Sequence, residues 1–219
     1  MCKRSIICMG NSYKNGGRCL AGIEVEKTFG VYSIVTNRDG SPKWLRPVMI
    51  NDCLGIPEHL VGTFGLFDIL DVDVIGIAPT GAQNENVYFR SIVKIGHYNG
   101  GLNSLCDNSH SLIFGNKGKA VAADDFCDVG YSLMIIKPQD LYIESQDGGG
   151  YEKFRMQFTY KGIRYDFPLT DPVYIRKLRN RTCSRGDRSG DEVFLTLSLG
   201  VCFNEWHYKL VAGVFDMAS

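Results

Sequence analysis

The chain has 219 residues, 44% of them hydrophobic, and equal numbers of basic and acidic side chains, 24 of each. This length suits two domains of about 100 residues, and the composition excludes a disordered tail. The formal net charge of zero argues against a partner that is held by overall charge alone.

Short alternating or apolar runs, separated by turn signals, follow one another through the first half of the chain. Asn37-Arg38-Asp39-Gly40 is one such turn signal. We expect the first module to span residues 1–110 and to contain strands at residues 5–9, 20–26, 31–36, 44–46, 67–77 and 87–95.

The second half begins with a stretch rich in Asn, Ser, Gly and Asp. We interpret residues 111–128 as a connector with a short helix at 120–126, and residues 129–219 as a second module. Lys161-Gly162 predicts a tight hairpin turn, and Asp171-Pro172 predicts the start of a helix over 173–181. Strands are expected at residues 131–137, 139–144, 154–160, 163–167, 193–199 and 208–215. The predicted fold class is all-β with a minor helix, in two tandem small barrels.

The cysteines and the missing apolar segments limit the chemistry and the location of the protein. No two cysteines have the C-x-x-C spacing and no two histidines have ligand spacing, so we expect free thiols, no metal site and no cofactor. No apolar stretch approaches the ~18 residues of a membrane span. We therefore expect a soluble, cytoplasmic protein that makes no membrane contact. The eight cysteines are Cys2, Cys8, Cys19, Cys53, Cys106, Cys127, Cys183 and Cys202.

Charge is distributed unevenly along the chain. Residues 47–89 contain no Lys or Arg but six acidic residues, from Asp52 to Glu85. Residues 176–188 contain six basic residues and one acidic residue, Asp187. Each stretch is either a solvated loop or a surface that faces a charged partner.

Two clusters in the first half have the residue types of a phosphate or base site. In Asn15-Gly16-Gly17-Arg18-Cys19, a glycine turn presents Arg18, whose guanidinium could hold a phosphate with two hydrogen bonds. The alternative is a hairpin turn with a buried Cys19. In Trp44-Leu45-Arg46-Pro47, strand alternation puts Trp44 and Arg46 on one face, where they suit a stacked base and its phosphate. The alternative is a core Trp covered by the stem of Arg46.

A third cluster, Trp206-His207-Tyr208-Lys209, lies near the C-terminus. Alternation places Trp206 and Tyr208 on one face of a strand and His207 and Lys209 on the other. The two aromatic side chains could stack bases, or they could belong to the core.

Several short segments together resemble the bacterial dual OB-containing domain family. These segments are Ile6-Ile7-Cys8-Met9, Asn11-Ser12, Gly17-Arg18-Cys19-Leu20-Ala21-Gly22, Trp44-Leu45-Arg46-Pro47-Val48, Ser198-Leu199-Gly200 and Tyr208-Lys209-Leu210-Val211-Ala212. The resemblance implies two tandem OB-like barrels and an association with bacterial conflict or nucleic-acid-processing systems. It assigns no catalytic residues.

Three functions stay open at this point. The first is a nucleic-acid-binding module for DNA or RNA. The second is a small-nucleotide sensor or enzyme that uses the Gly-Gly-Arg-Cys turn. The third is a protein-interaction subunit whose acidic stretch faces a partner encoded by a neighbouring gene. For the first function, the expected binding residues are Arg18, Trp44, Arg46, Arg179, Arg181, Arg185, Trp206, Tyr208 and Lys209.

Overall fold

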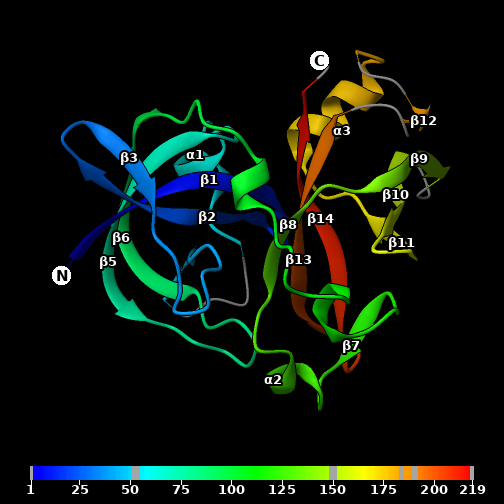
Figure 1. Ribbon diagram of the computed structural model, residues 1–219, viewed down its shortest axis with the longest axis horizontal. Helices are drawn as coiled ribbons and strands as arrows, with labels where there is room; N and C mark the ends of the chain where they lie inside the picture. The colour runs from blue at the N-terminus through cyan, green and yellow to red at the C-terminus, as the bar shows by residue number, and fades with distance from the viewer. Residues whose placement is uncertain (1, 51–54, 148–151, 183–184, 189–191, 218–219) are drawn as a thin grey trace. The chain divides into compact units, whose positions relative to one another are not determined.

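The computed structural model describes residues 2–50, 55–147, 152–182, 185–188 and 192–217. The chain divides into two compact units, Met1–Gly101 and Leu102–Ser219 (Figure 1). Within the described ranges, no helix has both the length and the apolar character needed to cross a membrane. Cys53 and Cys183 fall outside these ranges, and the other six cysteines are free thiols.

The first unit is a closed barrel. Strand β1 pairs with both β2 and β5, β5 pairs with β6, and β6 pairs in parallel with β4, which returns to β2. Strand β3 extends the sheet beyond β2, and the short helix α1 (Glu58–Val61) lies between β4 and β5 in the chain. The strands are β1 (Cys2–Lys14), β2 (Gly17–Thr28), β3 (Val31–Ile34), β4 (Trp44–Val48), β5 (Asp68–Ile77) and β6 (Asn86–His97).

The core of this barrel collects the inward-facing members of the alternating runs. Ile6 and Cys8 on β1 pack with Leu20 on β2 and Leu45 on β4. Burying each such aliphatic side chain stabilises the fold by about 1.5–3 kcal/mol. The period-two pattern that predicts the strands therefore also defines the barrel interior.

The second unit contains two four-stranded sheets, in the orders β11-β10-β9-β12 and β7-β14-β13-β8. Only Lys137 and Pro138 separate β8 from β9, so one run of chain contributes to both sheets. A parallel bridge from Leu169 to Val211 joins β11 to β14, and Thr170 reinforces it by donating from N and Oγ1 to the Val211 carbonyl, both at 2.9 Å. The strands are β7 (Ala120–Ala122), β8 (Leu133–Ile136), β9 (Gln139–Asp147), β10 (Glu152–Tyr160), β11 (Ile163–Pro168), β12 (Gly186–Asp187), β13 (Val193–Phe203) and β14 (Trp206–Asp216).

Both units follow the same strand order. The run β8–β9 takes the place of β1, and β10, β11, β13 and β14 take the places of β2, β4, β5 and β6. Helix α3 (Pro172–Arg179) occupies the position that α1 has in the first unit. The predicted fold class, all-β with minor helices in two tandem OB-like barrels, is confirmed.

Local signals in the second unit also have the expected result. Lys161 (φ 49°) and Gly162 (φ 76°) both adopt the left-handed conformation of a tight hairpin turn. Asp171 caps α3, because its Oδ1 accepts hydrogen bonds from the backbone N–H groups of Val173 (2.9 Å) and Tyr174 (3.1 Å).

The helix expected at residues 120–126 is wrong for all but its last residue. Ala120–Ala122 form strand β7, which pairs with the start of β14, residues 123–125 form a turn, and the short helix α2 (Phe126–Val129) begins at Phe126. Alanine favours helices intrinsically, but backbone pairing with an open strand edge outweighs that preference. The 3₁₀ turns η1 (Asn103–Leu105) and η2 (Ile113–Gly115) precede β7, and all these elements belong to the second unit.

Candidate nucleic-acid interface

Arg18 lies inside the first barrel. It is 4% exposed, and its guanidinium pairs with Glu58 of α1 at 2.5 Å and lies 4.8 Å from the centroid of the Tyr13 ring. The glycine turn before it has a packing role, since a Cβ on Gly17 would lie 2.4 Å from the Ile56 carbonyl oxygen. Arg18 and Ile56 exchange backbone hydrogen bonds at 2.8 Å there. We therefore leave Arg18 out of the candidate interface.

Arg46 is also enclosed in the first unit. It is 3% exposed, and its Nη2 lies 3.0 Å from Oε1 of Glu85, whose side chain is 8% exposed. Its Nη1 contacts Oδ1 of Asn86 at 3.5 Å. Trp44, two residues earlier, is partly exposed. The Trp44 ring is thus partly accessible, whereas the Arg46 guanidinium is buried and already pairs with a carboxylate.

The hairpin formed by β13 and β14 has the opposite character. Asn204 (φ 49°) and Glu205 (φ 66°) make its two-residue turn, in the left-handed conformation typical of a type I′ hairpin. Phe203 pairs with Trp206 across the turn, and the alternation of β14 puts Tyr208 on the same face as Trp206. That face carries Phe203, Trp206 and Tyr208, which are 63%, 46% and 42% exposed. We call these three residues the aromatic shelf.

Strand β7 leaves the rings of the shelf accessible. Ala122 pairs with Trp206 and Ala120 with Tyr208, and both alanines are partly exposed while Val121 between them is buried. A methyl group beside each ring is too small to cover it. The outer surface of β7 and β14 is therefore a row of small and aromatic side chains open to solvent.

The inner face of β14 carries His207 and Lys209, which alternate with Trp206 and Tyr208 and make buried contacts. His207 stacks on Phe126 of α2, with ring centroids 3.6 Å apart, and its Nδ1 lies 2.9 Å from the Gly200 carbonyl oxygen. Lys209 is fully buried, and its ammonium donates to the Ile113 carbonyl (2.6 Å), the Asn116 carbonyl (2.7 Å) and Asn116 Oδ1 (2.8 Å). Burial lowers the pKa of Lys209 to about 7. Lys209 thus holds the segment around η2 onto the barrel and does not face a ligand.

Two cations lie beside the shelf on the outer face of the same unit. Lys119 immediately precedes β7, and its Nζ lies 3.2 Å from Oδ2 of Asp166 on β11. Nε of Arg155 on β10 lies 2.7 Å from the other oxygen of that carboxylate. Burial by itself raises the pKa of Asp166, but hydrogen bonds and charge from Arg155 and Lys119 outweigh it and lower the pKa. Two cations share one ionised carboxylate, so the group keeps a net positive charge.

The arginines expected to hold phosphates lie at the far end of β14 from the shelf. Tyr174 of α3 donates to Asp216, the last residue of β14, at 3.2 Å, whereas Trp206 begins that strand. Figure 1 shows α3 at one end of β14 and β7 at the other. Arg179 and Arg181 are exposed, and Arg185 is partly exposed and pairs with Glu152 at 2.7 Å.

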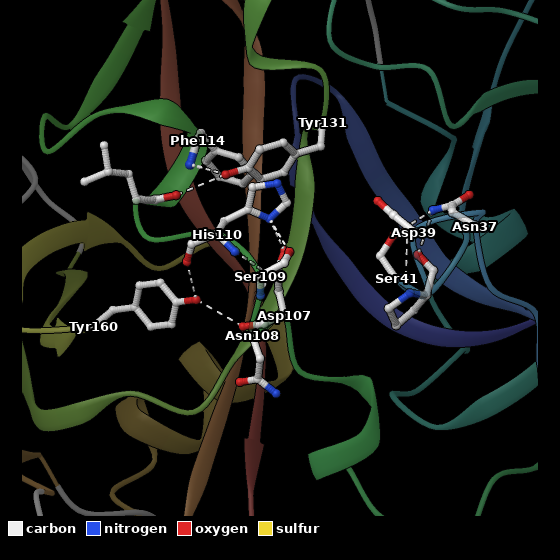
Figure 2. Close-up of polar contacts among 12 residues, drawn as sticks. Asn37, Asp39, Ser41, Asp107, Asn108, Ser109, His110, Phe114, Tyr131 and Tyr160 are labelled. Carbon is white, nitrogen blue, oxygen red and sulfur yellow. Dashed lines mark hydrogen bonds and ion pairs between the residues drawn. The ribbon is translucent and has the colours of Figure 1, made fainter.

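A polar cluster at the start of the second unit has the residue types of a catalytic dyad (Figure 2). Nδ1 of His110 lies 2.6 Å from Oδ2 of Asp107 and 3.1 Å from Oγ of Ser109. A Ser-His-Asp triad needs the acid and the nucleophile on different ring nitrogens, so this cluster is not one.

Asp107 and His110 of this cluster also make contacts that hold the surrounding loop against Tyr131 and Tyr160. The His110 ring stacks on Tyr131 at 4.0 Å, and Tyr160 donates to the carbonyls of Asp107 and His110, both at 3.0 Å (Figure 2). Burial raises the pKa of Tyr131 to about 12 and that of the neighbouring Cys106 thiol to about 11. The Tyr131 hydroxyl and the Cys106 thiol are therefore uncharged at pH 7. Across the described residues, His, Cys, Asp and Glu side chains form no group of three or more suited to a metal ion.

Sequence reasoning selected Trp206 and Tyr208 but missed Phe203, Lys119 and Arg155. The expected strand ended at Leu199, whereas β13 continues to Phe203. Alternation extended from Leu199 would have put Phe203 on the buried face, because Leu199 pairs with the buried Lys209. The register shift between Leu199 and Cys202 instead brings Phe203 opposite Trp206. Nothing local marks Lys119 and Arg155, because Asp166 brings them together only in the folded unit.

Comparisons with known proteins bear on the family of the chain. Among solved structures, the chain is similar to a murine DNA-binding protein bound with double-stranded DNA (TM-score 0.35, 6% identity, 98% of this chain and 97% of that chain covered). It is also similar to a tetrameric HIN2 crystal structure (TM-score 0.32, 9% identity, 98% and 91% covered). Similarity at such TM-scores carries no information on fold or function. The comparison with curated proteins gives no match. A family model described as the dual OB-containing domain matches residues 4–214. The chain therefore belongs to the dual OB-containing domain family.

Proposed function

We propose that the second unit binds single-stranded DNA or RNA by stacking bases on the aromatic shelf. The observation that carries the proposal is the exposure of three aromatic rings on one face of the β13–β14 hairpin, beside the small side chains of β7. Every base has a flat π-face, so such rings bind single strands with little sequence preference.

The position of the shelf in the fold supports this proposal. OB barrels commonly bind oligonucleotides across the face of their second and third strands and the loops beside it. In this unit those strands are β10 and β11, and the β13–β14 turn is the corresponding loop between the last two strands. Arg155 on β10 and Lys119 beside β11 supply positive charge next to the shelf. Stacking rings and cations are then available in the same unit, with Lys119 directly before the strand that pairs with Trp206 and Tyr208.

Fluorescence anisotropy with labelled 12-nucleotide DNA and RNA at low salt tests the proposal. We expect Trp206→Ala and Phe203→Ala each to weaken binding by about 1–3 kcal/mol, or roughly 5- to 150-fold, because each removes one stacking ring. Phe29→Ala is the control, since Phe29 is a fully exposed aromatic side chain in the first unit. Absence of binding below about 100 μM, the range of non-specific binders, would reject the proposal.

We further propose that the protein acts as an accessory component of a bacterial nucleic-acid-processing or defence system. Its membership of the dual OB-containing domain family supports this role. The expected outcome is that nucleic acid co-purifies with the wild-type chain from its native cells and is lost with Trp206→Ala. An equal nucleic-acid content in the two preparations would contradict the role assigned to the shelf.

A second candidate function, binding of a protein partner, is favoured by exposed aliphatic side chains on β6 in the first unit. Val93 is 56% exposed, and Ile95, two residues further along the same strand, is 44% exposed. Exposed aliphatic side chains close together are typical of protein-interaction sites. Co-expression with the product of a neighbouring gene tests this candidate. A stable complex with the wild-type chain that is lost in Val93→Ser/Ile95→Ser would support it, and unchanged capture by the double variant would reject it.

A further inference from the structure

The geometry points to a ligand path that runs from the aromatic shelf, past Lys119 and Arg155, to the arginines at the end of α3, so that the second unit binds a single strand long enough to reach both ends. This inference rests on the proposed function and adds a length requirement to it. The occupant is a single-stranded polynucleotide of either sugar type.

The far end of the path is a built group of arginines around Glu152, the first residue of β10. Arg185 pairs with both oxygens of the Glu152 carboxylate, at 2.7 and 3.1 Å, and Arg179 donates to the Glu152 carbonyl at 2.9 Å. Arg185 also donates to the Leu178 carbonyl at 2.9 Å and lies 5.2 Å from the centroid of the Phe154 ring. These contacts hold two guanidinium groups at Glu152, one on its carboxylate and one on its backbone carbonyl, and two cations against one carboxylate give the group a net positive charge.

Helix α3 adds exposed charge beside this group. Arg176 and Arg179 are one helical turn apart, and both are exposed, as is Arg181 just after the helix. Exposed arginines around a tethered pair form the kind of surface that holds phosphate oxygens with charge-assisted hydrogen bonds.

Strand β10 connects the two ends. Its outward-facing residues include Lys153, which is exposed, and Arg155, which meets Lys119 at the Asp166 carboxylate. The Lys119 carbonyl in turn accepts a hydrogen bond from the backbone N–H of Lys209, one residue beyond Tyr208 of the shelf. Cationic side chains therefore occur at the start of β10, along its outward-facing residues and directly before β7, so that a phosphate backbone on this path meets a cation at each stage.

The length of β14 sets the scale of the ligand. Trp206 begins the strand and Asp216, next to α3, ends it. The strand has eleven residues, and at about 3.3 Å per step its first and last residues lie roughly 33 Å apart. A strand with a rise of about 3.4 Å per nucleotide needs about 10 nucleotides to cover that distance, and a more extended strand needs fewer. A 4-nucleotide strand reaches only one end.

Anisotropy titrations of the full chain with oligo-dT and oligo-U of 4, 8, 12 and 16 nucleotides test this path. We expect affinity to rise at least about 10-fold between 4 and 12 nucleotides, because the second end then binds intramolecularly, and to level off beyond 12. The combined variant Arg176→Gln/Arg179→Gln/Arg181→Gln should return the 12-nucleotide strand toward the affinity of the 4-nucleotide strand. It should also reduce the salt dependence of the 12-nucleotide strand by about 0.7 for each lost phosphate contact.

Controls separate this inference from the proposed function. Lys3→Gln/Lys27→Gln/Arg38→Gln removes three exposed charges from the first unit and should leave the length dependence unchanged. Equal affinities for 4 and 12 nucleotides, or a 12-nucleotide affinity that ignores the α3 variant, would overturn the path while a Trp206→Ala effect still upheld stacking. Failure of every strand to bind would overturn both.

Discussion

The two barrels place similar sequence patterns in opposite environments. In the first unit, Arg46 of Trp44-Leu45-Arg46 forms a buried ion pair with Glu85, and Trp44 is only partly exposed. In the second unit, Trp206-His207-Tyr208-Lys209 buries its cation completely and leaves both rings in solvent. A basic residue next to an aromatic residue in the sequence therefore does not predict ligand binding until the partner of the basic side chain is known. The carboxylate of Glu85 and the carbonyls around Lys209 decide which residues support the fold and which stay accessible.

The largest expected effect is a loss of stability in the first unit that leaves the aromatic shelf of the second unit unchanged. Arg46→Leu leaves Glu85 enclosed without its cation, so we expect a loss of about 3–5 kcal/mol in the free energy of unfolding. The double variant Arg46→Leu/Glu85→Leu should recover most of this loss. Each unit contains one of the two tryptophans, so urea unfolding in a Trp206→Phe background follows the first unit through Trp44. A loss below about 1 kcal/mol would mean that the pair contributes little.

The buried lysine of the second unit should give a pH-dependent stability. The pKa of Lys209 is lowered to about 7 in the folded chain, and the unfolded value is about 10.4. Between these values the unfolded chain binds one more proton, so the free energy of unfolding should rise with pH, by up to about 1.4 kcal/mol per pH unit. Below pH 7 and above about pH 10.4 this group contributes no slope.

Urea unfolding of the wild type and Lys209→Met between pH 6 and pH 10 measures that slope. The wild-type curve should climb relative to the variant above pH 7, and Lys119→Met, which removes an exposed lysine nearby, should follow the wild type. Parallel curves for the wild type and Lys209→Met would show instead that the three oxygen acceptors keep the ammonium charged throughout.

A smaller effect is expected at the end of β14 farthest from the shelf. Asp171→Ala removes the cap of α3 and also the Oδ2 atom that accepts from the Val214 N–H at 3.0 Å. We expect a loss of about 1–2 kcal/mol in stability, with the affinity for a 4-nucleotide strand unchanged. Thermal unfolding by circular dichroism and anisotropy measure the two quantities. Asp171→Asn keeps a capping oxygen and should lose less.

The smallest expected effect concerns the two-residue turn that joins the strands of the aromatic shelf. Glu205→Gly produces an Asn-Gly turn, the preferred sequence for a type I′ hairpin, and relieves a left-handed conformation that a side chain disfavours. We expect a gain of about 1 kcal/mol in stability, together with slightly tighter binding because a negative charge leaves the tip. Asn204→Ala, which keeps the strain and loses the favoured residue, should destabilise. A weaker affinity in Glu205→Gly would indicate that the carboxylate contacts the ligand.

Much of this architecture follows from short-range information in the sequence. Alternation over four to seven residues predicts strands at almost every observed position, and Lys161-Gly162 and Asp171-Pro172 mark a turn and a helix start through their own backbone preferences. These signals succeed because each depends on the residue and its immediate neighbours. The rings at positions 206 and 208 could be selected in the same way, from the period of a strand.

Tertiary structure alone decided which side chains remain accessible. Arg18 meets Glu58 across 40 residues of chain, and Lys209 meets Asn116 across 93. Ala120–Ala122 became a strand because β14 offered a free edge, and Lys119 and Arg155 came together at Asp166 on another strand. The burial of a charge depends on acceptors brought in from elsewhere in the fold, and no local pattern contains them.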